Sequence, residues 1–190
     1  MRSHSRLFMA GVIGAAAVAP LGAQFGLFKG NSKVEYVAFK DPGQQFVLEY
    51  PKDWQAIGGA GDVVVSLAQK KNEAAVIVER FKMNTALAPQ DVTDLFAQIE
   101  TDVLKERQPK ATDVASKVVD QNGQRLIVLD YARVGVAGPE RVRQYSFPLG
   151  QVLYRLTCSA PTVHFAKYDQ VFAHIADTFK TAATPAADRP

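Results

Sequence analysis

The chain has 190 residues, of which 47% are hydrophobic and 22% are charged. This composition is that of an ordinary globular protein, and it excludes a disordered, collagen-like or repeat chain. The formal net charge is +3, from 22 basic and 19 acidic residues. The first 23 residues contain two arginines and no acid, so the rest of the chain has 20 basic and 19 acidic residues and is nearly neutral. Such a balance does not indicate nucleic-acid binding. The single cysteine, Cys158, excludes an internal disulfide bond and a zinc site built from several cysteines.

The first 23 residues have the three-part layout of a secretory signal peptide. Met1–Arg6 is short, polar and basic, Leu7–Val18 is uncharged and rich in Ala and Gly, and small residues follow as far as Ala23. We therefore expect cleavage after Ala23 and export of the mature chain. A retained membrane anchor is the alternative, because the apolar run Leu7–Ala23 falls only slightly short of the ~20 residues that span a bilayer. No cysteine lies near its end, which excludes a bacterial lipoprotein anchor.

The rest of the chain is predicted to form one domain, residues 34–182. Residues 24–33 are expected to form an extended lead-in, and the Ala- and Pro-rich residues 183–190 a disordered tail. Neither an internal repeat nor a linker divides the body of the chain.

Apolar and polar residues alternate in the first half of the domain, which predicts strands. Phe46, Leu48 and Tyr50 would share one face of such a strand, and Pro51 would end it. A hairpin turn is expected around Lys70-Lys71-Asn72. The predicted strands are residues 34–39, 46–50, 62–69 and 74–83.

The period then changes to that of an amphipathic helix between Pro89 and Pro109. Acidic residues lie near its start and basic residues near its end, as the helix dipole favours. Apolar residues recur at the i, i+3, i+4, i+7 spacing, so their stripe is expected to face the core. This stripe consists of Val92, Leu95, Phe96, Ile99, Val103 and Leu104.

Strands return after this helix, and a second helix closes the domain. Asn122-Gly123 is the strongest short signal for a hairpin turn, here between strands 113–120 and 124–133. Pro148-Leu149-Gly150 is expected to turn a second hairpin between 140–147 and 151–159. About eight strands and two helices, with hairpin connections, predict an α+β fold with an antiparallel sheet. The apolar stripe of the second helix, which begins near Pro161, is Phe165, Tyr168, Phe172, Ile175 and Phe179.

Two stretches of the sequence resemble the two ends of PsbP-like domains. Gln45–Trp54 is similar to their opening strand, which has the pattern F-x-hydrophobic-x-Y-P-x-x-W. The strand Tyr154–Pro161, the helix start Phe165–Tyr168 and the final Asp177–Phe179 are similar to their closing elements. The resemblance implies an α/β/α sandwich around a central antiparallel sheet, and a non-enzymatic extrinsic protein.

The resemblance also implies locations and partners. In oxygenic phototrophs the family occupies the thylakoid lumen, where members support photosystem II and its calcium and chloride retention or help to assemble other complexes. Related domains occur in exported bacterial proteins. The chain lacks the lipidated cysteine of cyanobacterial members, and its leader is too short for a two-part chloroplast presequence, so both the lumen and the periplasm stay open. We expect a monomeric accessory protein of a membrane-bound or envelope complex. Calcium is implied only by the resemblance, and no other cofactor is expected.

Basic side chains supply the candidate docking residues. Arg141 and Arg143 share one face of a strand, and two further arginines lie on strands expected beside it, so four arginines would form one anion-binding patch. The alternative is that each arginine pairs with a cross-strand carboxylate such as Asp130. In the resembled family a basic N-terminal segment contributes to docking, which makes three lysines a second candidate patch. The two patches are Arg133, Arg141, Arg143 and Arg155, and Lys29, Lys33 and Lys40.

Catalytic and metal-binding motifs are weak. His174 and Asp177 are three residues apart on the second helix and would supply two metal ligands. Two ligands make a weak site, so a solvated helix face is the better interpretation. Cys158 and His164 would form a thiol hydrolase pair only if the cysteine were exposed, and its alternation favours an inert buried residue. Trp54 is interpreted as a residue of the core edge.

Neither Glu100 nor Glu106 indicates an acid–base pair, since they lie six residues apart among basic residues. The alternative function is binding of a small ligand between sheet and helix, which requires an internal apolar pocket.

Overall fold

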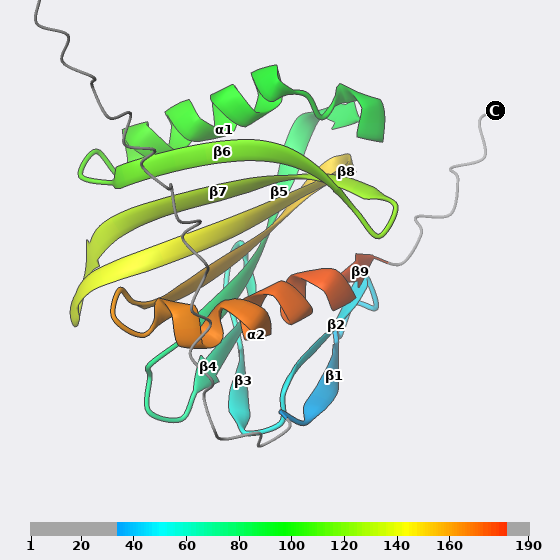
Figure 1. Cartoon of the computed structure of the whole chain (residues 1–190). Coiled ribbons are helices and arrows are strands. Elements are labelled where there is room, and N and C mark those ends of the chain that lie inside the picture. Colours follow the sequence, from blue (N-terminus) through cyan, green and yellow to red (C-terminus); the bar gives the residue numbers. More distant parts are fainter. Residues whose placement is uncertain (1–33, 182–190) are drawn as a thin grey trace, which may run out of the picture. The chain divides into compact units, whose positions relative to one another are not determined.

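The computed structural model describes residues 34–181 (Figure 1). The predicted signal peptide, the lead-in 24–33 and the tail 183–190 lie outside these residues. Within the described range, no helix has both the length and the apolar character needed to cross a membrane.

Two antiparallel sheets make up the strands of the domain. The larger sheet has six strands in the order β3-β4-β5-β8-β7-β6, and the smaller has three in the order β1-β2-β9. The larger sheet contains β3 (Trp54–Gly58), β4 (Val63–Gln69), β5 (Ala75–Leu87), β6 (Thr112–Gln121), β7 (Gln124–Gly135) and β8 (Gly138–Pro161). The smaller contains β1 (Tyr36–Lys40), β2 (Phe46–Pro51) and β9 (Lys180–Thr181).

The long strand β8 doubles back on itself at Pro148–Gly150. In a straight strand Phe147 and Tyr154 would lie about 23 Å apart at ~3.3 Å per residue. Instead both rings contact Phe179, at centroid distances of 4.7 and 5.5 Å. The first half of β8 pairs with β7 and the second half pairs with β5. The predicted hairpin is therefore confirmed, and its two halves are the yellow and orange arms of β8 in Figure 1.

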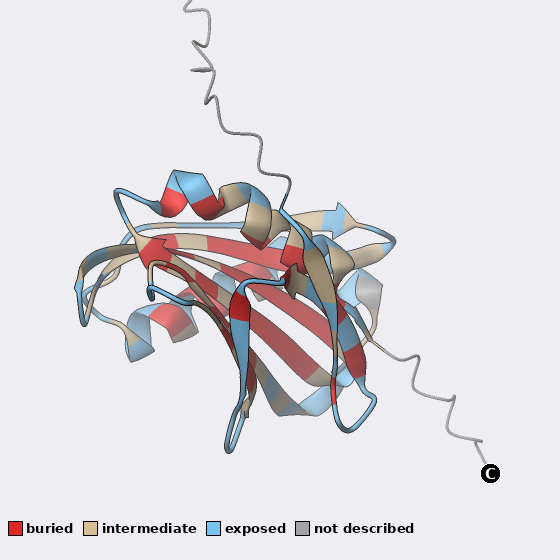
Figure 2. Ribbon diagram, turned by 90° about the horizontal axis from the view of Figure 1, so that it is seen from below, coloured by how far each residue is buried: buried red, intermediate tan, exposed pale blue. Residues whose placement is uncertain are grey.

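Helices cover both faces of the larger sheet. Helix α1 (Asp94–Arg107), which follows the short helix η1 (Pro89–Asp91), lies on one face, and α2 (Phe165–Thr178) lies on the other. A hydrophobic core lies between the larger sheet and each of the two helices, and alternate residues of β7 contribute to both cores. Leu126 and Val128 pack toward α2, whereas Ile127 and Leu129 pack toward α1. This confirms the α+β fold and its α/β/α layers, and Figure 2 shows the buried residues along the strands of the sheet.

Residues 34–181 contain nine strands where about eight were expected, and the expected strands 140–147 and 151–159 are the two arms of one strand, β8. Strand β3 was not predicted, because only Trp54 of its five residues is buried, and neither was the two-residue β9. The Asn122-Gly123 turn is confirmed, with φ values of 52° and 76° at its two central residues. Both angles are positive, as the type I′ hairpin turn requires.

The predicted orientation of α1 is partly wrong. Leu95 is 71% exposed and Ile99 is 48% exposed, so neither faces the core. The helix turns a different face to the sheet, one that contains two polar residues. Both polar side chains have hydrogen-bond partners there, which makes their burial possible. The buried residues of α1 are Ala97, Glu100, Thr101 and Leu104.

Candidate functional site

The four candidate arginines do not share one face of the sheet. Residues directly opposite each other in an antiparallel pair point to the same side of the sheet. Arg133 lies opposite Glu140, and Glu140 points to the other side from its chain neighbour Arg141. Arg133 therefore faces α1, with Arg155, whereas Arg141 and Arg143 face α2. The single patch predicted from the sequence is wrong for this reason.

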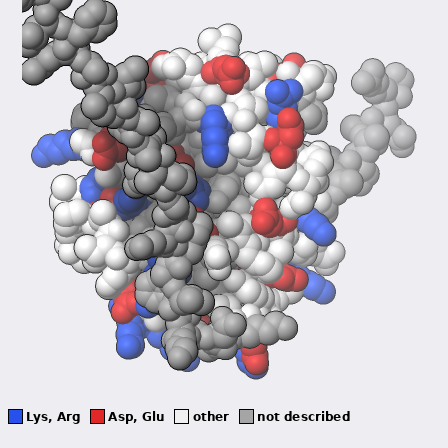
Figure 3. All heavy atoms as spheres, in the orientation of Figure 1, with Lys and Arg blue, Asp and Glu red and all other residues white. Residues whose placement is uncertain are grey.

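Cross-strand ion pairs occupy two of these arginines, as the alternative interpretation proposed. Arg143 Nε lies 2.8 Å from the Asp130 carboxylate of the facing strand, and its guanidinium also binds Asp169 of α2. Arg133 Nε lies 3.0 Å from Glu140. Figure 3 shows the same balance on the face it presents, where acidic and basic side chains are interspersed.

Two basic candidates stay exposed in the described range. Arg141 has no carboxylate within ion-pair distance among residues 34–181, and its guanidinium lies 5.8 Å from the centre of the Phe165 ring. Lys40 is exposed at the end of β1. Lys29 and Lys33 lie outside the described residues.

Exposed apolar side chains accompany Arg141 at one end of the sheet. Val136, in the turn between β7 and β8, is fully exposed, and Val134 is 78% exposed. A hydrogen bond joins the loop before α2 to this hairpin, since the Thr162 backbone N–H donates to the Pro139 carbonyl at 3.0 Å. The next residue of that loop, Val163, is a third exposed valine. We call this surface the β7–β8 tip. It consists of Val134, Val136, Arg141 and Val163.

A cavity of about 220 Å³ lies between α1 and the larger sheet. We call it the α1 cleft. Apolar side chains from the sheet and from α1 form part of its wall, and charged and amide side chains form the rest. The apolar residues are Val63, Ile77, Val103 and Leu104, and the charged residues are Glu79, Glu100, Arg107, Arg133 and Arg155.

A buried ion pair joins the two walls of the α1 cleft. Arg155 Nη2 donates to Glu100 Oε2 at 2.8 Å, and their side chains are only 9% and 7% exposed. The same carboxylate oxygen accepts a hydrogen bond from the Ser146 hydroxyl at 3.1 Å. The Arg155 guanidinium lies 4.9 Å from the centre of the Phe81 ring. Its Nε is buried and has no hydrogen-bond partner among residues 34–181.

Glu79 is the second carboxylate of the cleft, and it lies directly opposite Arg155 in the β5–β8 pair. Partial burial raises the pKa of Glu79 above its ordinary value, and the positive charges of Arg155 and Arg107 oppose that rise. Part of the Glu79 population is therefore kept neutral to a higher pH than an exposed glutamate would be.

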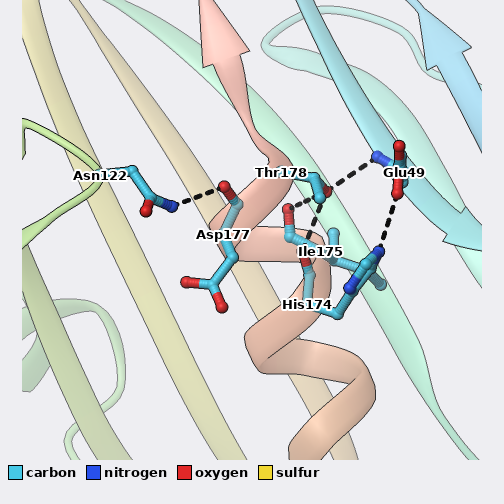
Figure 4. A network of polar contacts seen from close by, with 6 residues as sticks. All are labelled: Glu49, Asn122, His174, Ile175, Asp177 and Thr178. Atoms are coloured by element: carbon cyan, nitrogen blue, oxygen red, sulfur yellow. Dashed lines mark hydrogen bonds and ion pairs between the residues drawn. The ribbon is translucent and has the colours of Figure 1, made fainter.

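The structure does not bring His174 and Asp177 together (Figure 4). His174 Nε2 lies 3.0 Å from Glu49 of β2, and its ring stacks on Tyr36 at 3.7 Å. The Asp177 carboxylate instead accepts from the side chain of Gln121. Within residues 34–181, no group of three or more His, Cys, Asp or Glu side chains is arranged to hold a metal ion.

Cys158 and Trp54 belong to the core. Cys158 is fully buried, and burial raises the pKa of its thiol, whereas His164 is exposed. The predicted burial of the cysteine is confirmed. Trp54 packs edge-on against Tyr168 and Phe172, which confirms its packing role.

A family model described as PsbP matches residues 34–181. The chain belongs to the PsbP family. No curated protein matches the chain. Solved structures match at low identity and establish the fold alone. Cyanobacterial PsbP (CyanoP) from Synechocystis sp. PCC 6803 is 14% identical, with a TM-score of 0.59, and the match covers 86% of this chain and 100% of CyanoP.

Two other structural matches have different descriptions. The Ran-binding protein Mog1p of Saccharomyces cerevisiae is 11% identical, with a TM-score of 0.53 and coverage of 77% of this chain and 95% of Mog1p. LpqN of Mycobacterium tuberculosis, involved in cell envelope biogenesis, is 10% identical, with a TM-score of 0.55 and coverage of 79% of this chain and 92% of LpqN. This PsbP-family chain thus shares its fold with proteins of unlike description.

The charged residues of the α1 cleft were not predicted as a group from the sequence. Glu100 was set aside because its neighbours in the sequence are basic, yet its partner is Arg155, 55 positions away. One signal was available. Gln151, Arg155 and Thr157 alternate along β8 and give its second face a polar character, which calls for polar residues on the helix that covers it.

Proposed function

We propose that this PsbP-family chain is an exported, non-enzymatic binding protein that serves as an accessory of a membrane-bound or envelope protein complex. The observation that carries the proposal is the β7–β8 tip. Val134, Val136 and Val163 expose apolar surface beside Arg141, which has no ion-pair partner in the described part of the chain. The Thr162–Pro139 hydrogen bond holds this hairpin in place. Exposed apolar residues gathered with an arginine are typical of protein interfaces.

The positions of the reactive side chains support a binding role. Cys158 is enclosed in the core, Glu100 is neutralised by Arg155, and His174 is held between Tyr36 and Glu49. Each of these groups already has a structural partner. The family resemblance implies a non-enzymatic protein as well, and proteins with this fold include one described as Ran-binding.

The leader and the family together suggest where the protein acts. In an oxygenic phototroph the proposed location is the thylakoid lumen and the first complex to examine is photosystem II. In another bacterium the proposed location is the periplasm or the outside of the cell. In both cases we propose a monomer that binds at the membrane surface through a partner protein.

Co-purification of the tagged chain, with its leader, from the cells that make it tests this function. A partner complex should be recovered at low salt and released at high salt, since a charged contact is screened within roughly 8–10 Å at 0.1–0.15 M salt. A calcium chelator in one wash tests the calcium dependence that the resemblance implies.

Matched variants locate the contact. Val136→Asp and Arg141→Glu should abolish recovery of the partner. Leu95→Asp and Lys117→Glu change exposed residues elsewhere and should leave recovery unchanged. Failure to recover any partner at low salt, or equal loss with all four variants, contradicts the proposal.

A further inference from the structure

We propose that the α1 cleft is a binding site for a small organic acid, a molecule with one carboxylate group and an apolar body. This site is separate from the β7–β8 tip, and the proposal does not rest on the proposed docking function. Three features carry it, namely the size of the cleft, its charge and one buried donor.

The size of the cleft sets the size of the ligand. An engineered protein cavity of about 150 Å³ holds one benzene molecule. The α1 cleft, at about 220 Å³, therefore has room for a ring of that size with a carboxylate attached. Val63 and Ile77 on the sheet, with Val103 and Leu104 on α1, provide the apolar wall for such a body.

The charge of the cleft favours an anion. Among its three arginines, Arg155 is paired with Glu100, and Arg133 is paired with Glu140. Arg107 takes part in none of the ion pairs found in residues 34–181. It is exposed on the last turn of α1, so it marks the solvent side of the cleft. Among the described residues that line the cleft, Glu79 is the one carboxylate besides the paired Glu100, and burial disfavours the charged form of Glu79.

Arg155 Nε supplies the second point of attachment. A buried side-chain N–H group without an acceptor is unusual in a folded protein, because the large majority of buried side-chain polar atoms are paired. The guanidinium cannot turn freely toward a new partner, since Nη2 is held by Glu100 and the plane packs on Phe81. Nε is closed even to a water molecule, so an acceptor reaches this donor only when the cleft wall beside Arg155 moves as the ligand enters. A carboxylate then held between Arg155 Nε and the Arg107 guanidinium would satisfy the unpaired donor and would receive two charge-assisted hydrogen bonds.

The partly enclosed shape of the cleft favours a small molecule over a protein. An acidic side chain of a partner would have to enter a cavity that is partly closed by α1, and its backbone would remain outside. A free organic acid carries its own apolar body into the cleft. A partner's acidic side chain is therefore treated below as an outcome of the test.

Titration of the mature chain with benzoate, phenylacetate and hexanoate, monitored by NMR, tests the proposal. Benzyl alcohol serves as the neutral counterpart of benzoate, and inorganic phosphate as an anion without an apolar body. At least one of the three acids should bind saturably, with a Kd below ~10 mM, and about tenfold more tightly than benzyl alcohol and phosphate. The methyl signals of Val103 and Leu104 and the Nε–H signal of Arg155 should shift together.

Two exposed residues of α1 provide a matched pair of variants. Arg107→Gln should weaken binding of the acid about tenfold or more, whereas Lys105→Gln removes the same charge two residues away and should change it less than about twofold. Both positions are exposed, so both variants should fold.

Other results overturn the proposal. The proposed ligand class is wrong if none of the three acids binds by ~10 mM, or if phosphate binds as tightly as they do. A partner protein whose recovery is lost with Arg107→Gln but kept with Val136→Asp would identify an acidic side chain as the occupant. If no acid binds but Val136→Asp still abolishes partner recovery, the cleft proposal fails and the docking function stands.

Discussion

Removal of the buried Glu100 carboxylate is expected to destabilise the protein strongly. Glu100→Ala leaves Arg155 charged and buried and takes an acceptor from the Ser146 hydroxyl. At ~4 Å between charge centres and an effective dielectric constant of ~20, the lost attraction is about 4 kcal/mol. Measured losses for one partner of a buried pair are about 3–5 kcal/mol. Glu79, opposite Arg155, offers partial compensation, so we expect a loss of about 3 kcal/mol in the free energy of unfolding.

Urea denaturation followed by tryptophan fluorescence measures this loss, because the single tryptophan, Trp54, is buried in the core. Glu106→Ala, at an exposed position of the same helix, is the control and should change stability by no more than about 0.5 kcal/mol. The double variant Glu100→Leu/Arg155→Met should lie within about 1 kcal/mol of the parent, since apolar replacement of a whole buried pair is often neutral. A loss below about 1 kcal/mol for Glu100→Ala, or a double variant less stable than the single one, would refute this reasoning.

Three further changes test the packing, the turns and the titration of the domain. Leu104→Ala should lower the free energy of unfolding by about 2–4 kcal/mol and Leu95→Ala by less than about 0.5 kcal/mol in the same urea assay, and equal losses would contradict the observed face of α1. Gly123→Ala, at a φ of 76°, should cost about 1 kcal/mol in thermal unfolding, whereas Gly58→Ala, which meets no atom within 4 Å, should cost less. Because the pKa of Glu79 is higher in the folded state than its ordinary value of 4.5, its contribution to stability falls as pH rises through the window above 4.5. Glu79→Gln should therefore raise the Tm at pH 7, and the gain should vanish below pH ~4, while a gain that is constant with pH would show that charge is not its cause.

The sequence predicted the fold better than it predicted the site. Local patterns were sufficient for the hairpin at Asn122-Gly123 and for the fold-back at Pro148–Gly150, because turn residues act within a few positions. The face of α1 was not predictable in this way. Leu95 and Ile99 fit the apolar period, but Glu100 is buried instead because residues far away in the chain neutralise it.

The same limitation applied to the arginine patch. Alternation along one strand correctly placed Arg141 and Arg143 on the same side. Whether Arg133 joined them depended on the register between β7 and β8, and a shift of one residue moves a side chain to the other face. Arg133 lies opposite Glu140, so it points toward α1. Arg133 lines the α1 cleft because of this register.

The doubled strand β8 also determines the order in which the chain can complete its sheet. Strands β6 and β7 and the first arm of β8 are neighbours in sequence, so they can pair as soon as they are synthesised. The second arm must find β5, where Ala75 pairs with Ser159 across the whole of α1, β6 and β7. Contacts between such distant residues slow folding, because a long loop must close before they form. Until that arm is available, β3, β4 and β5 have no link to the rest of the larger sheet, and the chain stays an incomplete fold through most of its synthesis.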